Sequence, residues 1–308
     1  MSKMKKSAIV TVGFLAIMMI LPIIFLGCVP GEDGALDAAS GYSVTEKQLP
    51  VIAVTIVPEA TFVKAVCGEL AEVVVMVPPG ASPENYEPTP SQMEQFYGAD
   101  LYFAMGVPVE ETAILPNAGD LEVIFLSEEV AAVYPDLTFS PGQGTSEERD
   151  PHIWLSPKRV EVMVNVIARE MSKIDPQNSE TYEKNAGAYI EELEALDQQI
   201  KAELSGVKNR KFVSYHPAFS YIADDYGLEM FALEEEGKEA SPRHLQEMID
   251  LAKKENIKVI FYQEEFDSRQ AEAYAQEIGG KTMKLAPLAA DYVENMKRMA
   301  DTIASAME

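Results

Sequence analysis

The sequence predicts an α/β protein of two lobes, each a parallel sheet flanked by helices, bridged by one long rigid helix. In both halves of the 308-residue chain, apolar runs of strand length alternate with amphipathic stretches of helical period, and strands separated by helices form parallel sheets. Between the halves, Ser179–Leu204 carries apolar residues at spacings of three and four. At ~1.5 Å per residue this helix spans about 39 Å, which is longer than one small lobe. We therefore expect it to join the two lobes.

The N-terminus has the pattern of an export signal. Residues 1–27 contain three lysines followed by a long apolar run, and Cys28 comes directly after a glycine. This pattern is typical of a lipoprotein whose cysteine is lipidated, and an uncleaved N-terminal anchor is the alternative. Residues 28–49 are rich in small and polar residues and predict a flexible tether. Either reading places the folded part outside the cytoplasm, tethered to the outer face of the cytoplasmic membrane.

Charge and cysteine content exclude several kinds of function. The chain has 50 acidic and 25 basic side chains, a formal net charge of −25, which repels nucleic acid and anionic headgroups. Cys67 is the only cysteine besides Cys28, and it lies on an apolar helical pattern typical of a core position. Cys67 therefore has no second cysteine in the folded body with which to form a disulfide. A structural zinc site with two or four cysteine ligands cannot form there either.

The first lobe is expected over residues 50–177. Ligands of open α/β sheets collect beyond the carboxyl ends of strands, so the proline-stiffened loop Pro78–Pro90 after the second strand is the first place to look for a site. We expect strands at Pro50–Ile56, Ala71–Val77, Leu101–Ala104 and Leu121–Phe125, and helices at Glu59–Cys67, Ser91–Tyr97 and Lys158–Ile174.

The interlobe helix is assigned to residues 178–206 and the second lobe to residues 207–308. His216 comes just after the first strand of this lobe, again at a carboxyl end. We expect strands at Lys211–Tyr215, Met230–Leu233, Lys258–Tyr262 and Thr282–Leu285, and helices at Ala218–Tyr226, Pro242–Glu255, Ser268–Ile278 and Asp291–Met307.

Histidines are the first candidates for a binding site. His152 lies in the turn-like sequence Asp-Pro-His-Ile-Trp, where Asp150 could accept a proton from its ring and orient it as a metal ligand. His216 is followed by a proline that ends its strand and leaves the ring at the mouth of the sheet. For both residues, a hydrogen-bonded core histidine is an equally good reading. His244 lies inside an expected helix beside Arg243, where a solvated surface position is favoured.

Seven short motifs follow one another along the chain: Val51–Ile56, Val77–Gly80, Tyr86–Pro90, Ala99–Leu101, Asp150–Leu155, Ser214–His216 with Tyr226–Leu228, and Val259–Phe261. Taken in this order, they resemble the zinc/manganese solute-binding lipoproteins of ABC importers. The resemblance covers nearly the whole chain after the tether. It implies two α/β lobes on a rigid helix, a metal bound between the lobes, a monomer, and delivery of the metal to a membrane permease with its ATPase.

The resemblance carries the metal ligands over only in part. His152 and His216 match two of the family's histidines, but Glu84 stands where a first histidine is usual. Ala286 replaces the family's late carboxylate. A glutamate that many members place after the strand at Lys258–Tyr262 aligns with Gln263, so we hypothesise that the adjacent Glu264 or Glu265 supplies the fourth donor.

A set of two histidines and one carboxylate suits Zn²⁺, with Mn²⁺ or Fe²⁺ as alternatives. We expect a receptor rather than an enzyme, because the chain contains neither Gly-x-Ser-x-Gly nor a phosphate-binding Gly-x4-Gly-Lys-Ser/Thr motif. Two alternatives stay open. One is the same fold used for another solute or for adhesion, and the other, more remote, is a zinc hydrolase.

Overall fold

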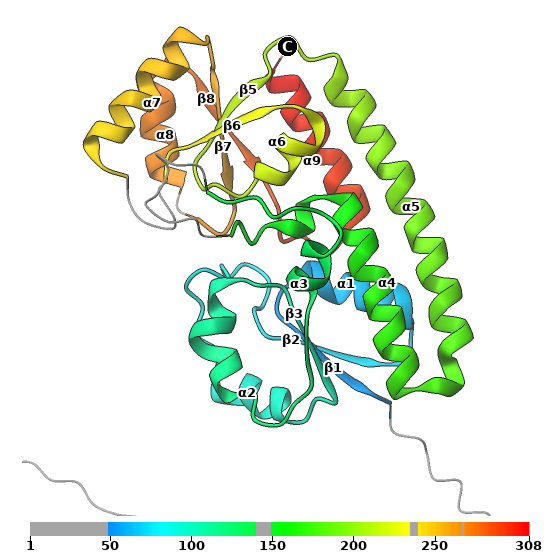
Figure 1. The fold of residues 1–308 in the computed structure, drawn as a ribbon. Helices are drawn as coiled ribbons and strands as arrows, with labels where there is room; N and C mark the ends of the chain where they lie inside the picture. Colours follow the sequence, from blue (N-terminus) through cyan, green and yellow to red (C-terminus); the bar gives the residue numbers. More distant parts are fainter. Residues whose placement is uncertain (1–48, 140–148, 235–239, 267, 308) are drawn as a thin grey trace, which may run out of the picture. The chain divides into compact units, whose positions relative to one another are not determined.

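Two parallel four-stranded sheets organise the chain, and both have the same topology (Figure 1). In each sheet the first strand lies between the second and the third, and the fourth strand forms an edge beside the third. The first sheet has the order β2-β1-β3-β4, with β1 at Val51–Val54, β2 at Glu72–Val75, β3 at Leu101–Ala104 and β4 at Val123–Phe125. The second has the order β6-β5-β7-β8, with β5 at Lys211–Ser214, β6 at Glu229–Ala232, β7 at Val259–Gln263 and β8 at Lys281–Leu285.

The structure is a computed structural model that describes residues 49–139, 149–234, 240–266 and 268–307. Contacts group the chain from Lys47 onward into one unit. The expected signal, Cys28 and nearly all of the expected tether lie outside the described residues. In the described part, no helix has both the length and the apolar character needed to cross a membrane.

Helices begin where the sequence supplies a capping residue and a proline. Thr89, Ser156 and Ser241 each accept a hydrogen bond from the backbone N–H three residues later, and each precedes a proline in the first helical turn. The helices are α1 (Val57–Cys67), α2 (Pro90–Tyr97), α3 (Leu126–Ala131), α4 (Pro157–Ile174), α5 (Ser179–Ser205), α6 (Ser220–Tyr226), α7 (Pro242–Lys254), α8 (Ser268–Glu277) and α9 (Tyr292–Ala306).

Helix α5 joins the two halves as the sequence predicts. Its 27 residues span about 40 Å, and it packs against α1 and α4 along one part of its length and against α6 and α9 along another (Figure 1). The prediction of two α/β lobes bridged by one long helix is confirmed. Several short elements were not predicted, among them α3 and a single π-helical turn at Glu110–Ile114. Both are too short to show a helical period.

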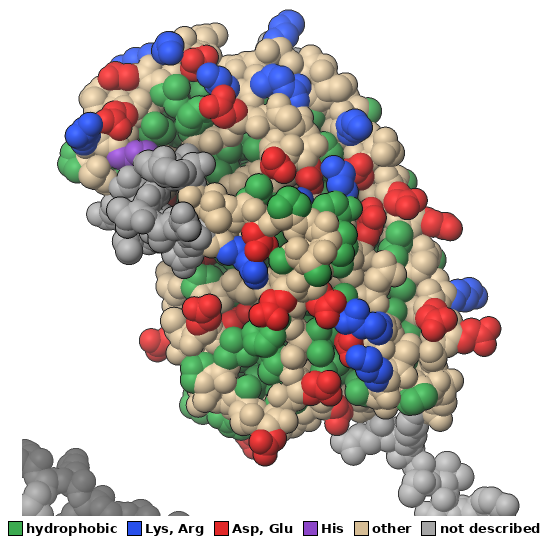
Figure 2. Space-filling view, viewed as in Figure 1, with side chains coloured by type: hydrophobic (Ala, Val, Ile, Leu, Met, Phe, Trp, Pro, Cys, Tyr) green, Lys and Arg blue, Asp and Glu red, His purple; other side chains and the backbone are tan. Residues whose placement is uncertain are grey.

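One large cluster of buried side chains joins the two sheets. It contains residues of both sheets together with side chains from α1, α4, α5 and α9, and the ring of Phe62 on α1 meets the ring of Tyr292 on α9 edge-on at 5.0 Å. A smaller, separate cluster lies where α7 and α8 cover the second sheet, and it includes Val213, Leu233 and Tyr274. Cys67 is buried, as expected for a core position. Acidic side chains are scattered over the face shown in Figure 2 rather than collected at one point.

Candidate metal centre

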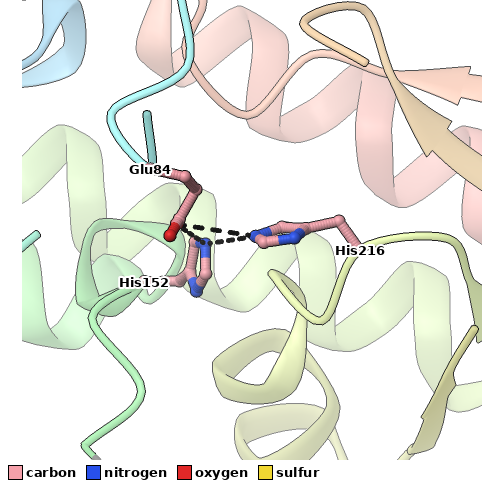
Figure 3. A group of neighbouring side chains, drawn as sticks. All are labelled: Glu84, His152 and His216. Atoms are coloured by element: carbon pink, nitrogen blue, oxygen red, sulfur yellow. Dashed lines mark hydrogen bonds and ion pairs between the residues drawn. The ribbon is translucent and has the colours of Figure 1, made fainter. Parts of the chain in front are cut away.

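Three side chains from separate parts of the chain point toward one another (Figure 3). Glu84 comes from the loop between β2 and α2, His152 from the segment before α4, and His216 from the turn after β5. Among the described residues this is the one group in which three potential metal-ligand atoms lie within 4.8 Å of one another. The structure therefore brings together three of the residues singled out from the sequence.

The distances between the three side chains are short. The Nε2 atoms of His152 and His216 are 3.3 Å apart, and Oε1 of Glu84 lies 3.9 Å from the first and 3.7 Å from the second. Both histidines are 3% exposed, and the side chain of Glu84 is 20% exposed. The site is thus almost closed to water, with Glu84 on its more open side.

Asp150 holds the His152 ring from behind. Its Oδ1 lies 2.7 Å from Nδ1 of His152 and also accepts a hydrogen bond from the backbone N–H of His152 at 2.9 Å. Asp150 is fully buried, and its backbone carbonyl accepts a hydrogen bond from the Tyr221 hydroxyl at 2.9 Å. A carboxylate on Nδ1 keeps the proton there, so Nε2 faces the other two side chains as the free donor atom.

The His216 ring is held in a similar way by residues of the second lobe. Its Nδ1 lies 2.6 Å from Oε2 of Glu234, and Phe266 stacks on its face with ring centroids 4.8 Å apart and an interplanar angle of 22°. Glu234 was not singled out from the sequence because it begins a run of glutamates, which is typical of a solvated surface. Only the pairing of β5 with β6 places it beside His216.

This arrangement requires a positive charge between the two rings. Both Nδ1 atoms face carboxylates, so each neutral ring would present an Nε2 lone pair to the other at 3.3 Å. Either a proton or a metal ion must lie between them. Two nitrogens bound to a tetrahedral zinc ion at ~2.05 Å would be about 3.3 Å apart. The observed separation therefore matches an edge of a zinc coordination tetrahedron.

The directions of the pKa shifts at the site indicate how its charges are balanced when no metal is bound. Burial would lower the pKa of His216, but Glu234 and Glu84 outweigh it and raise the pKa to about 9. Burial would raise the pKa of Glu84, but its interactions with His216 and His152 bring the pKa below its ordinary value. Without a metal, His216 therefore holds a proton beside an ionised Glu84, and a binding metal must release that proton.

The two carboxylates proposed from the sequence as the fourth donor differ in their surroundings. Glu264 is 45% exposed and pairs with Lys284 at 2.9 Å. Glu265 is partly buried, and its Oε2 finds no hydrogen-bond partner among the described residues. Burial raises the pKa of Glu265 and the nearby His216 opposes the rise, so the two side chains interact electrostatically. Neither carboxylate belongs to the group of three.

A cavity of about 510 Å³ adjoins the site. Its lining includes Glu84 and His216, together with Glu111, Glu128 and Arg149. The acidic side chains of this cavity favour a cation over an anion.

The third histidine has a structural role. A solvated position for His244 was expected, but its side chain is buried and its Nε2 lies 3.0 Å from the carbonyl oxygen of Ala232. This expectation was wrong because His244 lies on the inner face of α7, one turn before Met248 and two turns before the buried Ala252. That spacing of four was the signal in the sequence.

Comparison with known proteins gives a consistent picture. A family model described as zinc-uptake complex component A, periplasmic (ZnuA), matches residues 52–306. The chain is 32% identical to the zinc-binding lipoprotein AdcA of Streptococcus pneumoniae over 82% of its own length and 52% of the relative's, so it spans about half the length of that relative. It is 30% identical to the high-affinity zinc uptake system protein ZnuA of Bacillus subtilis, covering 75% of this chain and 76% of that one.

One solved structure resembles this chain in fold as well as in sequence. A crystal structure of ZnuA superposes with a TM-score of 0.77 at 34% identity, and the match covers 85% of this chain and all of the other. Both sheets and the long helix thus have counterparts in an experimentally determined protein.

Proposed function

The chain belongs to the family of periplasmic zinc-uptake components, and from this premise we propose that it captures a divalent transition metal outside the cytoplasm and delivers it to a membrane permease driven by an ATPase. Zinc is the first choice, because the names of the relatives specify zinc and because two imidazoles with a carboxylate suit this ion. Mn²⁺ and Fe²⁺ are the alternatives. The family is one of uptake components, which favours capture over hydrolysis.

One observation carries the proposal. Two buried histidine rings, each with a carboxylate on Nδ1, present their Nε2 atoms to each other 3.3 Å apart with Glu84 alongside. A pair of structural core histidines would instead direct each ring nitrogen to its own partner, as His244 does with Ala232. The ligands we propose are Glu84, His152 and His216.

Glu265 is our choice for the fourth donor. Its Oε2 is buried without a partner in the described part of the chain, and an unpaired carboxylate oxygen in such a place costs free energy unless it has another role. Glu264 already pairs with Lys284. Attachment to the outer face of the cytoplasmic membrane through a lipidated Cys28 or an N-terminal anchor, and action as a monomer, complete the proposal.

Calorimetric titration of the metal-stripped chain with Zn²⁺ tests the function. We expect about one equivalent of tightly bound zinc, lost in the double variant His152→Ala/His216→Ala. The variant His244→Gln, which changes the remaining histidine outside the group, should bind like the wild type. Absence of zinc and manganese binding by a folded wild-type chain would contradict the proposal and leave another solute, or adhesion, as the function of this fold.

A further inference from the structure

Glu234 is the partner of His216 on the side away from the other two donors. It follows β6, and its backbone N–H donates to the carbonyl oxygen of Tyr215 at 2.9 Å, which fixes it next to the residue before His216. Its Oε2 lies 2.6 Å from Nδ1 of His216, and the residue is 7% exposed. The carboxylate is therefore held by the sheet and directed at one ring nitrogen.

A neutral acceptor would have been enough to fix the orientation of the ring. His244 shows this, because a backbone carbonyl serves as the acceptor for its ring nitrogen. A buried carboxylate costs far more to desolvate than a carbonyl oxygen, so its presence calls for a further reason. The charge of the carboxylate makes the opposite nitrogen, Nε2, a stronger electron donor toward a metal.

We propose that Glu234 is a positioning residue that sets the preference of this site for zinc over manganese. The inference rests on the proposed metal-binding function. A stronger imidazole donor favours the ion that binds nitrogen more strongly, and for ligands of this kind zinc exceeds manganese. Glu84 supplies an oxygen donor that both zinc and manganese accept. The preference between the two ions therefore depends on the two histidines and on the carboxylates that contact their Nδ1 atoms.

The test compares the affinities of the wild type and Glu234→Gln for Zn²⁺ and for Mn²⁺, measured separately on the metal-stripped full chain. Glutamine keeps an acceptor for Nδ1 but removes the charge. We expect zinc affinity to fall about 10- to 100-fold and manganese affinity to fall less, so that the ratio of the two affinities decreases. Glu234→Asp, which retains the charge, should recover part of the ratio. Glu229→Gln is the matched control, since Glu229 lies on β6 with its side chain 57% exposed.

An equal loss for both ions would mean that Glu234 only supports the local structure, and unchanged affinities would mean that it has no role at the site. Either result overturns the inference while the proposed function stands. Failure of the wild type to bind zinc would instead overturn the proposed function. Should Glu234→Gln not fold, a long-range ¹H–¹⁵N spectrum of the zinc-loaded wild type replaces it. That spectrum should show His216 bound to zinc through Nε2 and strongly hydrogen-bonded at a protonated Nδ1, and zinc on Nδ1 would contradict the inference.

Discussion

His152 and His216 meet at one point but are anchored differently. The His152 segment is tied into the large core: the Trp154 ring N–H donates to the carbonyl oxygen of Pro287 at 3.0 Å, and the Tyr292 hydroxyl donates to the carbonyl oxygen of Trp154 at 2.8 Å. His216 is instead held by Glu234 and Phe266 at strand ends of the second sheet.

The residues that hold the two histidines also pack, in part, into different hydrophobic clusters. Trp154 and Tyr292 belong to the cluster that joins both sheets, whereas Leu233, next to Glu234, belongs to the smaller cluster under α7 and α8. We call the side of His152 the fixed side and the side of His216 the adjustable side, because we expect the second to move more when an ion binds. Because α5 packs against helices of both lobes, we expect only small movements between the lobes when metal binds.

The largest expected effect concerns the fixed side. Trp154 is 1% exposed, so Trp154→Ala should lower the free energy of unfolding by about 3–5 kcal/mol through the cavity it leaves. Phe266 is only partly buried, and Phe266→Ala should cost roughly half as much. Urea unfolding of both variants without metal measures the difference. Equal losses would show that the two sides are anchored alike.

A smaller effect is expected from the proposed fourth donor on the adjustable side. Glu265→Gln should weaken zinc binding by about tenfold, as removal of a carboxylate near a metal often does. Glu264→Gln removes only a pair with Lys284 on the surface and should change zinc affinity little. A competition titration against a chelator of known affinity distinguishes the two. If Glu264→Gln had the larger effect, the assignment of Glu265 would be wrong.

A separate effect, on the pH dependence of stability, concerns two acids buried in the first lobe. Glu59 accepts hydrogen bonds from the backbone N–H groups of Thr55 and Ile56 at 2.9 and 3.1 Å, and Glu110 accepts from those of Met105 and Gly106, both at 2.7 Å. Burial raises the pKa of Glu110 to about 7. Burial, together with the charge of Glu110, raises the pKa of Glu59 well above its ordinary value.

The sign of the pH dependence follows from these shifts. The unfolded chain releases both protons near its ordinary carboxyl pKa of 4.5, while the folded chain retains them to higher pH. Stability therefore falls as pH rises from 4.5, and the part due to Glu110 is fully lost above about 7. Glu59→Gln keeps an acceptor for Thr55 and Ile56, so urea unfolding at pH 5 and pH 8 should show a smaller loss than in the wild type. An equal loss in both would contradict this account.

Period and capping in the sequence were enough to predict the fold. The long helix was expected at Ser179–Leu204 and runs over Ser179–Ser205, because its apolar stripe persists over seven turns. Helix α3 was missed because six residues carry no period. The shared strand order of the two sheets was not predicted either, since the register of parallel strands depends on contacts between distant segments.

The site was predictable only where a residue type points to metal binding. A turn-like sequence drew attention to His152, a strand end to His216, and a carboxylate in the position of a family histidine to Glu84. Glu234 and Glu265 stand in acidic runs, where a solvated position is the ordinary reading. In the structure Glu234 is buried, and Glu265 is less exposed than the adjacent Glu264.

The most direct test of the metal centre is X-ray absorption at the zinc edge on the chain loaded with one equivalent of zinc. The structure predicts two imidazole rings bound at about 2.0–2.1 Å, with oxygen donors completing the shell. A shell without imidazole, or with a single ring, would show that His152 and His216 do not share the ion, and would contradict the central claim.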